Sequence, residues 1–266
     1  MKSAAFSPAH ITGFFKIHKS GSTGAGITLE DGMTTAINSK SSKDSIHING
    51  KKSNAPVSKN VINKYKELAG KFTVNVNHKT RIPIGYGLGM SAAGALSLSL
   101  ALSDCLGIVS VKEAKKIAHL AEIECKTGLG GVIAESTGGL VIRKKPGSFK
   151  YVEKIYTSGT VACSFFSPIN TKTIITNTNW KNKLNRFGDF CINEFQRAKS
   201  LEGFISLSRH FALETGLTSK AIHEIILENK NCSMAMLGRT IFSLNNFKTS
   251  RNFLVSKIGN KGAYII

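Results

Sequence analysis

The sequence has few acidic side chains. Its 266 residues include 16 Asp and Glu against 36 Lys and Arg, which gives a formal net charge of +20. Such an excess of cations raises nucleic acid as a partner. The cations are, however, spread along the chain and form no aromatic-interleaved stripe of the kind that nucleic-acid modules carry. We therefore expect a solvated basic surface that attracts anionic metabolites, and nucleic acid is not the favoured partner.

Paired cysteines and long uninterrupted apolar runs are also lacking. The five cysteines are scattered and never form a Cys-x-x-Cys pair; they are Cys105, Cys125, Cys163, Cys191 and Cys232. This pattern excludes a disulfide framework and a structural zinc of the usual spacing, and it suits a reducing cytosol. Serines and Asp104 break the longest apolar run, residues 92–109, and the first residues lack the apolar core of a signal peptide. We expect a cytoplasmic protein without a membrane span.

A glycine-rich stretch stands out among the features that are present. Gly85, Gly87 and Gly89 run straight into an alanine-rich helix. Glycines let an anion approach the main chain, and the first N–H groups of the helix point at the same place, so phosphate is the favoured guest; a plain tight turn is the alternative. No lysine occurs between Arg81 and Lys112, which excludes a Walker A loop. A Gly-x-Gly-x-x-Ala match is present, but a second helix follows where a dinucleotide fold needs a strand.

Two earlier segments are candidates for a site. Residues 8–13 put His10 and Thr12 on a turn, and residues 21–26 form a second small-residue loop that carries Ser22. Taken alone, each is more often a plain turn than a binding loop.

Local signals define the elements around the glycine-rich stretch. Residues 72–78 alternate with period two, which predicts a strand with one buried face. Residues 92–106 predict a buried helix that ends before a glycine. Ser110 and Glu113 form a capping box, which opens a helix over residues 111–126.

One face of that helix carries four polar side chains: Lys115, His119, Glu122 and Lys126. Their spacing puts them in line, and the face is either solvated, which is the commoner case, or turned into a cleft. A third glycine-rich turn, residues 127–139, follows around a short helix and leads into a strand that contains Arg143.

The remaining pattern indicates an α+β chain. Residues 3–47 predict short strands joined by turns. Further helices are expected near residues 59–68, 181–199, 201–215 and 219–228, and further strands near residues 140–144, 149–155, 160–166, 232–238, 240–244, 253–258 and 263–266. The order lacks the regular alternation of a parallel doubly wound sheet, so we expect two subdomains, residues 1–155 and 156–266.

Taken together, the motifs resemble those of the GHMP kinase superfamily, and more closely those of the archaeal pantoate kinases. The superfamily's ATP loop, Pro-x-x-x-Gly-Leu-Gly-Ser-Ser-Ala-Ala, is matched from Pro83 to Ala93 with Met90 in place of a serine. The likeness to the pantoate kinases rests on residues 8–15, 21–26, 87–94, 127–130, 138–143 and 233–238. It implies a GHMP-kinase-like fold with an N-terminal, ATP-binding ribosomal-S5-like half and a C-terminal ferredoxin-like half that completes the substrate cleft.

The resemblance implies a chemistry as well as a fold. The chain is expected to transfer the γ-phosphoryl group of ATP, with Mg²⁺, to the 4-hydroxyl of D-pantoate, giving 4-phosphopantoate for coenzyme A biosynthesis. Phosphoryl transfer asks mainly for positioning and charge stabilisation, which suits a site of backbone donors and cations.

The resemblance also implies roles for individual residues. ATP contacts fall on Pro83, Gly85, Gly87, Leu88, Gly89, Met90, Ser91, Ala92 and Ala93. Ser91 and Glu122 are the expected metal ligands. Substrate contacts fall on His10, Thr12, Ser22, Gly130 and Arg143, and catalytic roles on Arg143, Glu122 and His119. Arg143 is favoured because its forked guanidinium suits a carboxylate or a phosphate.

One position departs from the family pattern and leaves alternatives open. Gly131 stands where these kinases carry an aspartate that is the supposed general base. Either the phosphate itself takes the hydroxyl proton, or Glu135 or Glu122 substitutes, or the chain is a slow or non-catalytic relative that binds anions or nucleic acid. A kinase acting on another small hydroxy acid or alcohol is a further alternative, and a homodimer is left open.

Overall fold

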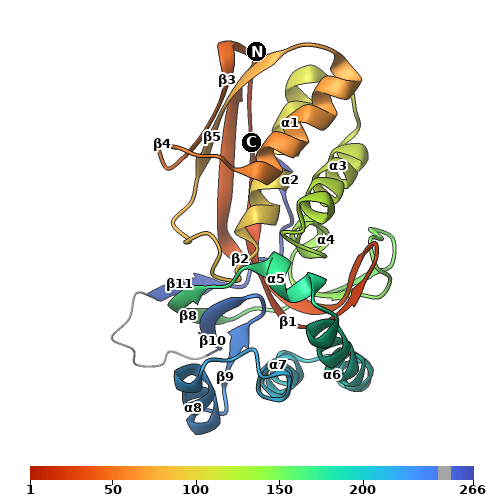
Figure 1. Cartoon of the computed structure of the whole chain (residues 1–266), viewed down its shortest axis with the longest axis vertical. Helices are drawn as coiled ribbons and strands as arrows, with labels where there is room; N and C mark the ends of the chain where they lie inside the picture. The colour runs from red at the N-terminus through yellow and green to blue at the C-terminus, as the bar shows by residue number, and fades with distance from the viewer. Residues whose placement is uncertain (245–252) are drawn as a thin grey trace.

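The computed structural model describes residues 1–244 and 253–266, which form two sheets with helices packed against them (Figure 1). In this part of the chain the strands are β1 (Lys2–His18), β2 (Gly21–Asn38), β3 (Lys40–Ile48), β4 (Lys51–Lys52), β5 (Thr73–Lys79), β6 (Leu140–Arg143), β7 (Val152–Ile155), β8 (Thr160–Pro168), β9 (Cys232–Ala235), β10 (Gly238–Ser243), β11 (Phe253–Lys257) and β12 (Tyr264–Ile265). The helices are α1 (Pro56–Ala69), α2 (Met90–Leu106), α3 (Val111–Cys125), α4 (Gly131–Thr137), α5 (Thr171–Thr176), α6 (Thr178–Arg197), α7 (Leu201–Thr215) and α8 (Lys220–Glu228). The expected α+β class is confirmed.

The first two strands form one long antiparallel hairpin, so the prediction of short strands and turns over residues 3–47 is wrong. The pairing runs from Lys2 opposite Asn38 to His18 opposite Gly21. The register shifts near Pro8 and near Thr12, which bends β1 where the sequence suggested a turn.

The small residues 21–26 therefore belong to a strand and not to a loop. A Cβ at Gly24 would lie 2.3 Å from the carbonyl oxygen of Phe14, and a Cβ at Gly26 would lie 2.6 Å from Nε2 of His10. Only glycine leaves room for β1 at these two positions. Close packing between the strands, and not a turn, is what these glycines provide.

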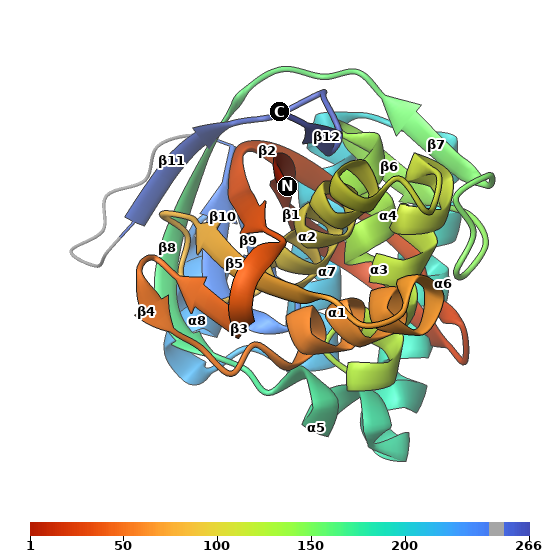
Figure 2. The ribbon, with the colours of Figure 1, turned by 90° about the horizontal axis from the view of Figure 1, so that it is seen from above.

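The larger sheet has the strand order β12-β1-β2-β5-β3-β4, with β6 and β7 continuing from β2. Helices α1 to α4 cover one face of it (Figures 1 and 2). The innermost helix, α2, is apolar almost all round its surface and is buried between the sheet and α1 and α3. The capping box at Ser110 is present as predicted, because its side chain accepts from the N–H of Glu113 while the Glu113 carboxylate accepts from the Ser110 N–H.

The smaller sheet has the order β11-β8-β10-β9, and α6, α7 and α8 pack below it in Figure 1. Phe14 and Phe15 of β1 reach into the same apolar core as Phe195, Phe204 and Phe211 of α6 and α7. The last strand, β12, returns to pair with β1 in the larger sheet. The N-terminal and C-terminal parts of the chain thus share one apolar core, and the C-terminal part adds β12 to the larger sheet. The proposed boundary at residue 155 stays a prediction.

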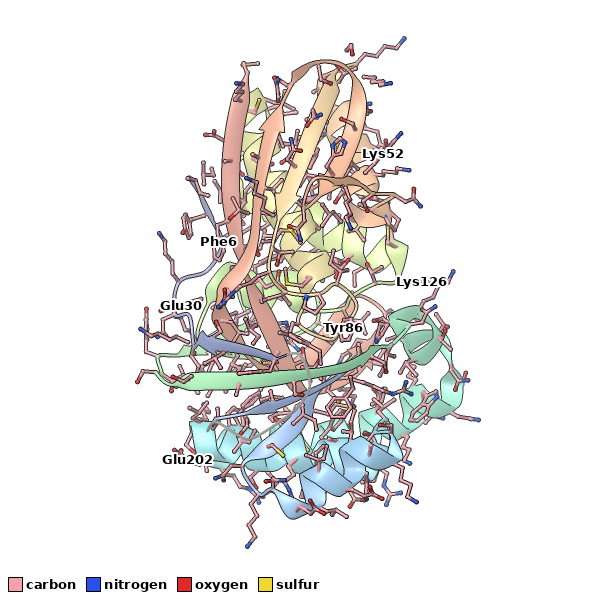
Figure 3. All side chains as sticks on the ribbon, turned by 90° about the vertical axis from the view of Figure 1, so that its left-hand side faces the viewer. Phe6, Glu30, Lys52, Tyr86, Lys126 and Glu202 are labelled. Atoms are coloured by element: carbon pink, nitrogen blue, oxygen red, sulfur yellow. The ribbon has the colours of Figure 1, made fainter. Side chains whose placement is uncertain are left out.

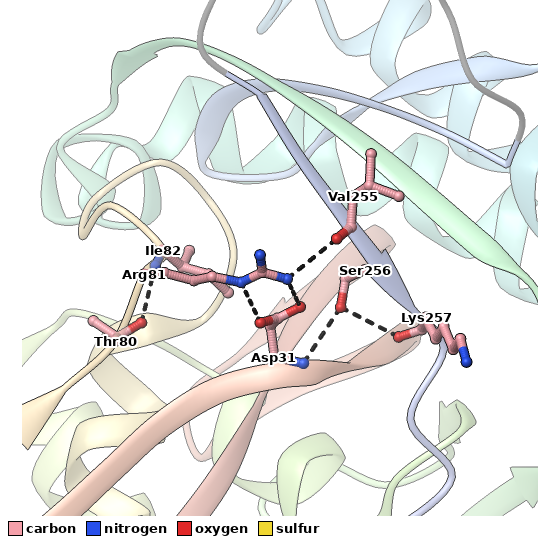
Figure 4. Close-up of polar contacts among 7 residues, drawn as sticks. All are labelled: Asp31, Thr80, Arg81, Ile82, Val255, Ser256 and Lys257. Carbon is pink, nitrogen blue, oxygen red and sulfur yellow. Dashed lines mark hydrogen bonds and ion pairs between the residues drawn. The ribbon is translucent and has the colours of Figure 1, made fainter.

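An ion pair joins the two sheets at one edge (Figure 4). Nε and Nη2 of Arg81 donate to the two carboxylate oxygens of Asp31 at 2.5 and 2.6 Å. Nη2 also donates to the carbonyl oxygen of Val255, and the N–H of Asp31 donates to Oγ of Ser256. Residues before the glycine-rich stretch are thereby fixed to both β2 and β11.

All five cysteines are free, and four of them are buried, in agreement with the expected lack of disulfides. Among residues 1–244 and 253–266, no helix has the length and hydropathy needed to cross a membrane.

Candidate active site

The glycine-rich stretch passes between the two sheets and ends at the start of α2. Gly85, Gly87 and Gly89 all have positive φ, at 89°, 87° and 71°. Gly89 is the N-cap of α2 in the left-handed region, so the first N–H groups of the helix are free of side-chain caps. A Cβ at Gly87 would lie 2.9 Å from Cα of Gly238, so the close approach of β10 also requires glycine here. This is the backbone geometry expected of an anion cradle.

A cavity of about 110 Å³ opens beside this cradle. It brings together most of the residues proposed from the sequence: His10, Thr12, Ser22, Gly85, Gly87, Gly89, Met90, Ser91, Ala92, Glu122, Gly130 and Arg143. These residues come from β1, β2, the glycine-rich stretch, α2, α3, the turn before α4 and β6. The segments that motivated the site therefore converge, although they are separated by up to 133 residues between His10 and Arg143.

Four of the proposed residues, all in the described part of the chain, do not line this cavity. Leu88 and Ala93 are buried behind it, and the Leu88 carbonyl accepts from the N–H of His10 at 3.0 Å. Pro83 lines a separate surface hollow together with Tyr86. Tyr86 lies at the level where the larger and the smaller sheet meet (Figure 3). Nε2 of His119 lies 3.4 Å from the Ser20 carbonyl oxygen. The roles of these four residues in ATP binding and catalysis stay predictions.

Ser91 and Glu122 form one wall of the cavity. The Ser91 hydroxyl donates to Oε1 of Glu122 at 2.6 Å, and the Thr127 hydroxyl donates to the same oxygen at 2.7 Å. Burial raises the pKa of Glu122, and the two hydroxyl donors oppose that rise. The polar face of α3 is thus partly turned inward: Glu122 and His119 are buried, whereas Lys126 is exposed. The alternative that this face is solvated, which was the commoner case, is therefore wrong for His119 and Glu122.

A buried guanidinium also lines the cavity. Arg143 is 1% exposed, and its Nε has no hydrogen-bond partner among the described residues. Burial lowers the pKa of Arg143 to about 10, which still leaves it cationic at neutral pH. Nη1 lies 3.5 Å from Nε2 of His10, whose pKa is lowered by burial and then by the charge of Arg143. Within residues 1–244 and 253–266, no carboxylate forms an ion pair with this cation.

Small residues bring the substrate-side groups together. A Cβ at Gly130 would lie 2.6 Å from both Nε of Arg143 and Oγ of Ser22. The Thr12 hydroxyl lies 3.1 Å from Nε2 of His10. A glycine at position 130 is thus what lets the guanidinium and the hydroxyl groups share one corner of the cavity.

Gly131 sits in a crowded place. A Cβ there would lie 2.8 Å from Cβ of Ala92 and 3.3 Å from Oε1 of Glu135. Glu135 is fully buried, and its pKa is raised well above its ordinary value by burial and then by the charge of Glu122. Its side chain lines neither the cavity beside the cradle nor the wider cavity that adjoins it. The suggestion that Glu135 replaces the expected aspartate as a base has no support in this geometry.

A second, wider cavity of about 400 Å³ adjoins the first and was missed by the sequence reasoning. The two share Gly85, Met90, Ser91, Thr127 and Thr171. Its walls are mostly apolar, with Met33, Ile48, Val57, Ile84 and Ile169 among them, and Ser58 and His78 are polar members. No local sequence pattern indicated this cavity, whose lining comes from segments far apart in the chain.

Comparison with known proteins agrees with this geometry. The family described as the GHMP kinases N-terminal domain matches residues 56–139. A pantoate kinase of Methanocaldococcus jannaschii is 39% identical over 260 residues, which cover 94% of this chain and 95% of that protein.

Solved structures share the whole fold. A phosphotransferase related to the CoA biosynthesis pathway superimposes with a TM-score of 0.88 at 27% identity and covers all of this chain and 98% of its own. MDDEF in complex with MVAPP, AMPPCP and magnesium superimposes with a TM-score of 0.76 at 14% identity, covering 100% of this chain and 99% of its own. The expected GHMP-kinase-like fold is confirmed, and the chain belongs to the pantoate kinase family of GHMP kinases.

Proposed function

We propose that this protein is an ATP-dependent kinase that phosphorylates the 4-hydroxyl of D-pantoate, giving 4-phosphopantoate and ADP for coenzyme A biosynthesis. Family membership supports the reaction class and the substrate. The observation that carries the site assignment is the buried Arg143, whose Nε has no hydrogen-bond partner among the described residues and which lines the same cavity of about 110 Å³ as the glycine-rich cradle. A buried cation favours a bound anion, and so do free backbone N–H groups. The site therefore suits two anionic groups, the carboxylate of pantoate at Arg143 and the phosphates of ATP at the cradle.

The phosphates and the base of ATP take different parts of the site. The cradle at Gly85, Gly87 and Gly89 offers main-chain N–H groups to phosphate oxygens. The adjoining apolar cavity of about 400 Å³ has the size and lining that suit a purine and its ribose. Lys126 and Lys172 lie at its rim and add cationic charge near the phosphates.

Pantoate takes the end of the smaller cavity beside Arg143. Its carboxylate suits the forked guanidinium and the Ser22 hydroxyl, which meet over Gly130. Its geminal dimethyl group suits the apolar surface of Phe15, Met236 and Leu237 on the same cavity. This arrangement leaves the 4-hydroxyl directed toward the glycine-rich cradle.

The residues at the cradle also fit a magnesium ion. Ser91 and Glu122 present a hydroxyl and a carboxylate oxygen, which are hard donors, and magnesium is commonly held by one carboxylate together with substrate phosphates. When bound there, the ion neutralises the charge that develops on the phosphate oxygens. Thr127, which donates to the same carboxylate, orients it.

The transfer needs no protein base in this reading. A bond forms between the 4-oxygen of pantoate and the γ-phosphorus while the bond to the bridging oxygen of ADP breaks, and the hydroxyl proton passes to a phosphate oxygen. A loose transition state permits this order of events. It accounts for a kinase that has Gly131 where an aspartate was expected. The cytoplasmic location and the homodimer stay predictions.

The direct test is an assay of ADP release with ATP, Mg²⁺ and a panel of acceptors. Release with D-pantoate, and not with homoserine, mevalonate or a sugar, supports the proposal. Turnover with one of the other acceptors and none with pantoate would rule out the substrate.

A further inference from the structure

A chain of buried polar side chains runs from the core of the molecule to the wider cavity. Its four members are Ser97, Thr35, His78 and Ser58. All four are buried, and the last two also line the cavity of about 400 Å³. They come from α2, β2, β5 and α1, so the chain ties the helix behind the cradle to the wall of the cavity.

The direction of each hydrogen bond follows from the first. Oγ of Ser97 lies 2.7 Å from the carbonyl oxygen of Ala93, and since a carbonyl has no proton, the Ser97 hydroxyl must donate. Oγ1 of Thr35 lies 2.6 Å from Oγ of Ser97, whose proton is already used. The Thr35 hydroxyl therefore donates to Ser97.

The same reasoning fixes the tautomer of the histidine. Nδ1 of His78 lies 2.7 Å from Oγ1 of Thr35, which has no proton left to donate, so Nδ1 carries the proton. Burial lowers the pKa of His78 to about 4, so the ring is neutral at pH 7 and Nε2 is bare. Oγ of Ser58 lies 3.0 Å from Nε2 and must donate its only proton there.

On the proposed assignment of this cavity to the base of ATP, we infer that the Ser58 hydroxyl presents only acceptor lone pairs to the base and thereby selects an amino group over a carbonyl. A base with an exocyclic amino group, as in adenine, donates to Ser58. A base with a carbonyl at that position, as in hypoxanthine, puts two acceptors face to face. The site rejects the second because a buried acceptor pair without a proton is costly.

The tautomer can be read without any ligand. Nitrogen-15 NMR of the histidine rings at pH 7 distinguishes protonated from bare ring nitrogens, and loss of one signal set in His78→Gln assigns the residue. The inference requires a proton on Nδ1 and none on Nε2. A proton on Nε2 would overturn it, because Ser58 would then be free to donate.

The selectivity is read from kcat/KM with ATP, with inosine triphosphate and with purine riboside triphosphate, which lacks the amino group. The wild type should favour ATP over inosine triphosphate by about 10-fold or more, and Ser58→Ala should bring the ratio within about 3-fold. Thr35→Val removes the acceptor that holds the tautomer, lies outside the cavity lining, and should also lower the ratio. Ser208→Ala removes a buried hydroxyl that bonds only within α7 and should leave the ratio unchanged.

Calorimetric titration with ATP distinguishes a failure of the proposed function from a failure of the role inferred for Ser58. If ATP does not bind, the proposed function fails, whatever the tautomer. If ATP binds and Ser58→Ala keeps the full preference for it over inosine triphosphate, the proposed function stands and the role of Ser58 is overturned.

Discussion

Oε1 of Glu135 lies 3.3 Å from the point that a Cβ on Gly131 would occupy. The same Cβ would lie 2.8 Å from Cβ of Ala92 at the start of α2. The place where related kinases are expected to carry an aspartate is thus filled from two sides, by the buried Glu135 and by the helix that follows the cradle. A glycine at position 131 avoids both contacts.

Restoring the aspartate should harm the protein. We expect Gly131→Asp to lower the free energy of unfolding by about 1–3 kcal/mol through overpacking, and to lower kcat as Ala92 is displaced. Gly131→Ala, which adds only the Cβ, should have most of the effect on stability. Urea unfolding and ADP release measure the two quantities. A variant with aspartate that is as stable as the wild type and faster would contradict this reading.

Arg143 should contribute to kcat/KM through both its positive charge and its forked guanidinium. Arg143→Ala is expected to cost on the order of 2–5 kcal/mol in kcat/KM for pantoate, because it leaves a buried anion unpaired. Arg143→Lys keeps the charge but not the fork and should recover only part of the loss. The matched control is Arg197→Ala, at a guanidinium whose side chain is 76% exposed. Near-normal activity in Arg143→Ala would remove this residue from the site.

Ser91 and Glu122 should act as a unit. Each of Ser91→Ala and Glu122→Gln is expected to lower kcat and to raise the magnesium concentration needed for half activity. The double variant should lose less than the sum, with a coupling energy of about 1–3 kcal/mol, because the two side chains are hydrogen-bonded at 2.6 Å. Ser136→Ala, whose hydroxyl bonds within α4, is the control. Strict additivity would contradict the view that Ser91 and Glu122 act as a unit.

The buried histidine should make stability depend on pH. The pKa of His78 is about 4 in the folded chain, below the ordinary value of about 6.5 that applies when it is unfolded. The unfolded state therefore binds more protons between these values, so the contribution of His78 is complete above pH 6.5 and is lost as the pH falls toward 4.

This loss amounts to about 3 kcal/mol, at 1.4 kcal/mol for each unit of pKa. Urea unfolding at several pH values measures it. His10 and His119, whose pKa values are also lowered, change stability in the same direction, so the comparison is between the wild type and His78→Gln. If the free energy of unfolding depended equally on pH in the two proteins, the lowered pKa of His78 would be contradicted.

The sequence was most informative where local geometry determines structure. The glycines of the cradle, the buried α2 and the capping box at Ser110 depend on neighbours within a few residues, and each was predicted correctly. The motif order then placed the chain in its family.

The predictions from sequence failed where contacts between segments far apart in the chain determine the structure. Residues 21–26 look like a loop until β1 packs against their glycines. The wider cavity is lined by side chains from β2, α1, β5 and α5, and the hydrogen bond between Thr35 and His78 joins residues 43 positions apart. Neither leaves a local pattern. The inward turn of Glu122 likewise depends on Ser91, 31 residues away.

ADP release with a panel of acceptors measures whether the protein phosphorylates pantoate. With ATP and Mg²⁺ present, we predict turnover when D-pantoate is added and none with homoserine, mevalonate or a sugar. Phosphorus NMR of the product should show a phosphomonoester on the primary 4-hydroxyl. No ADP release with D-pantoate, from protein that binds ATP, would contradict the account.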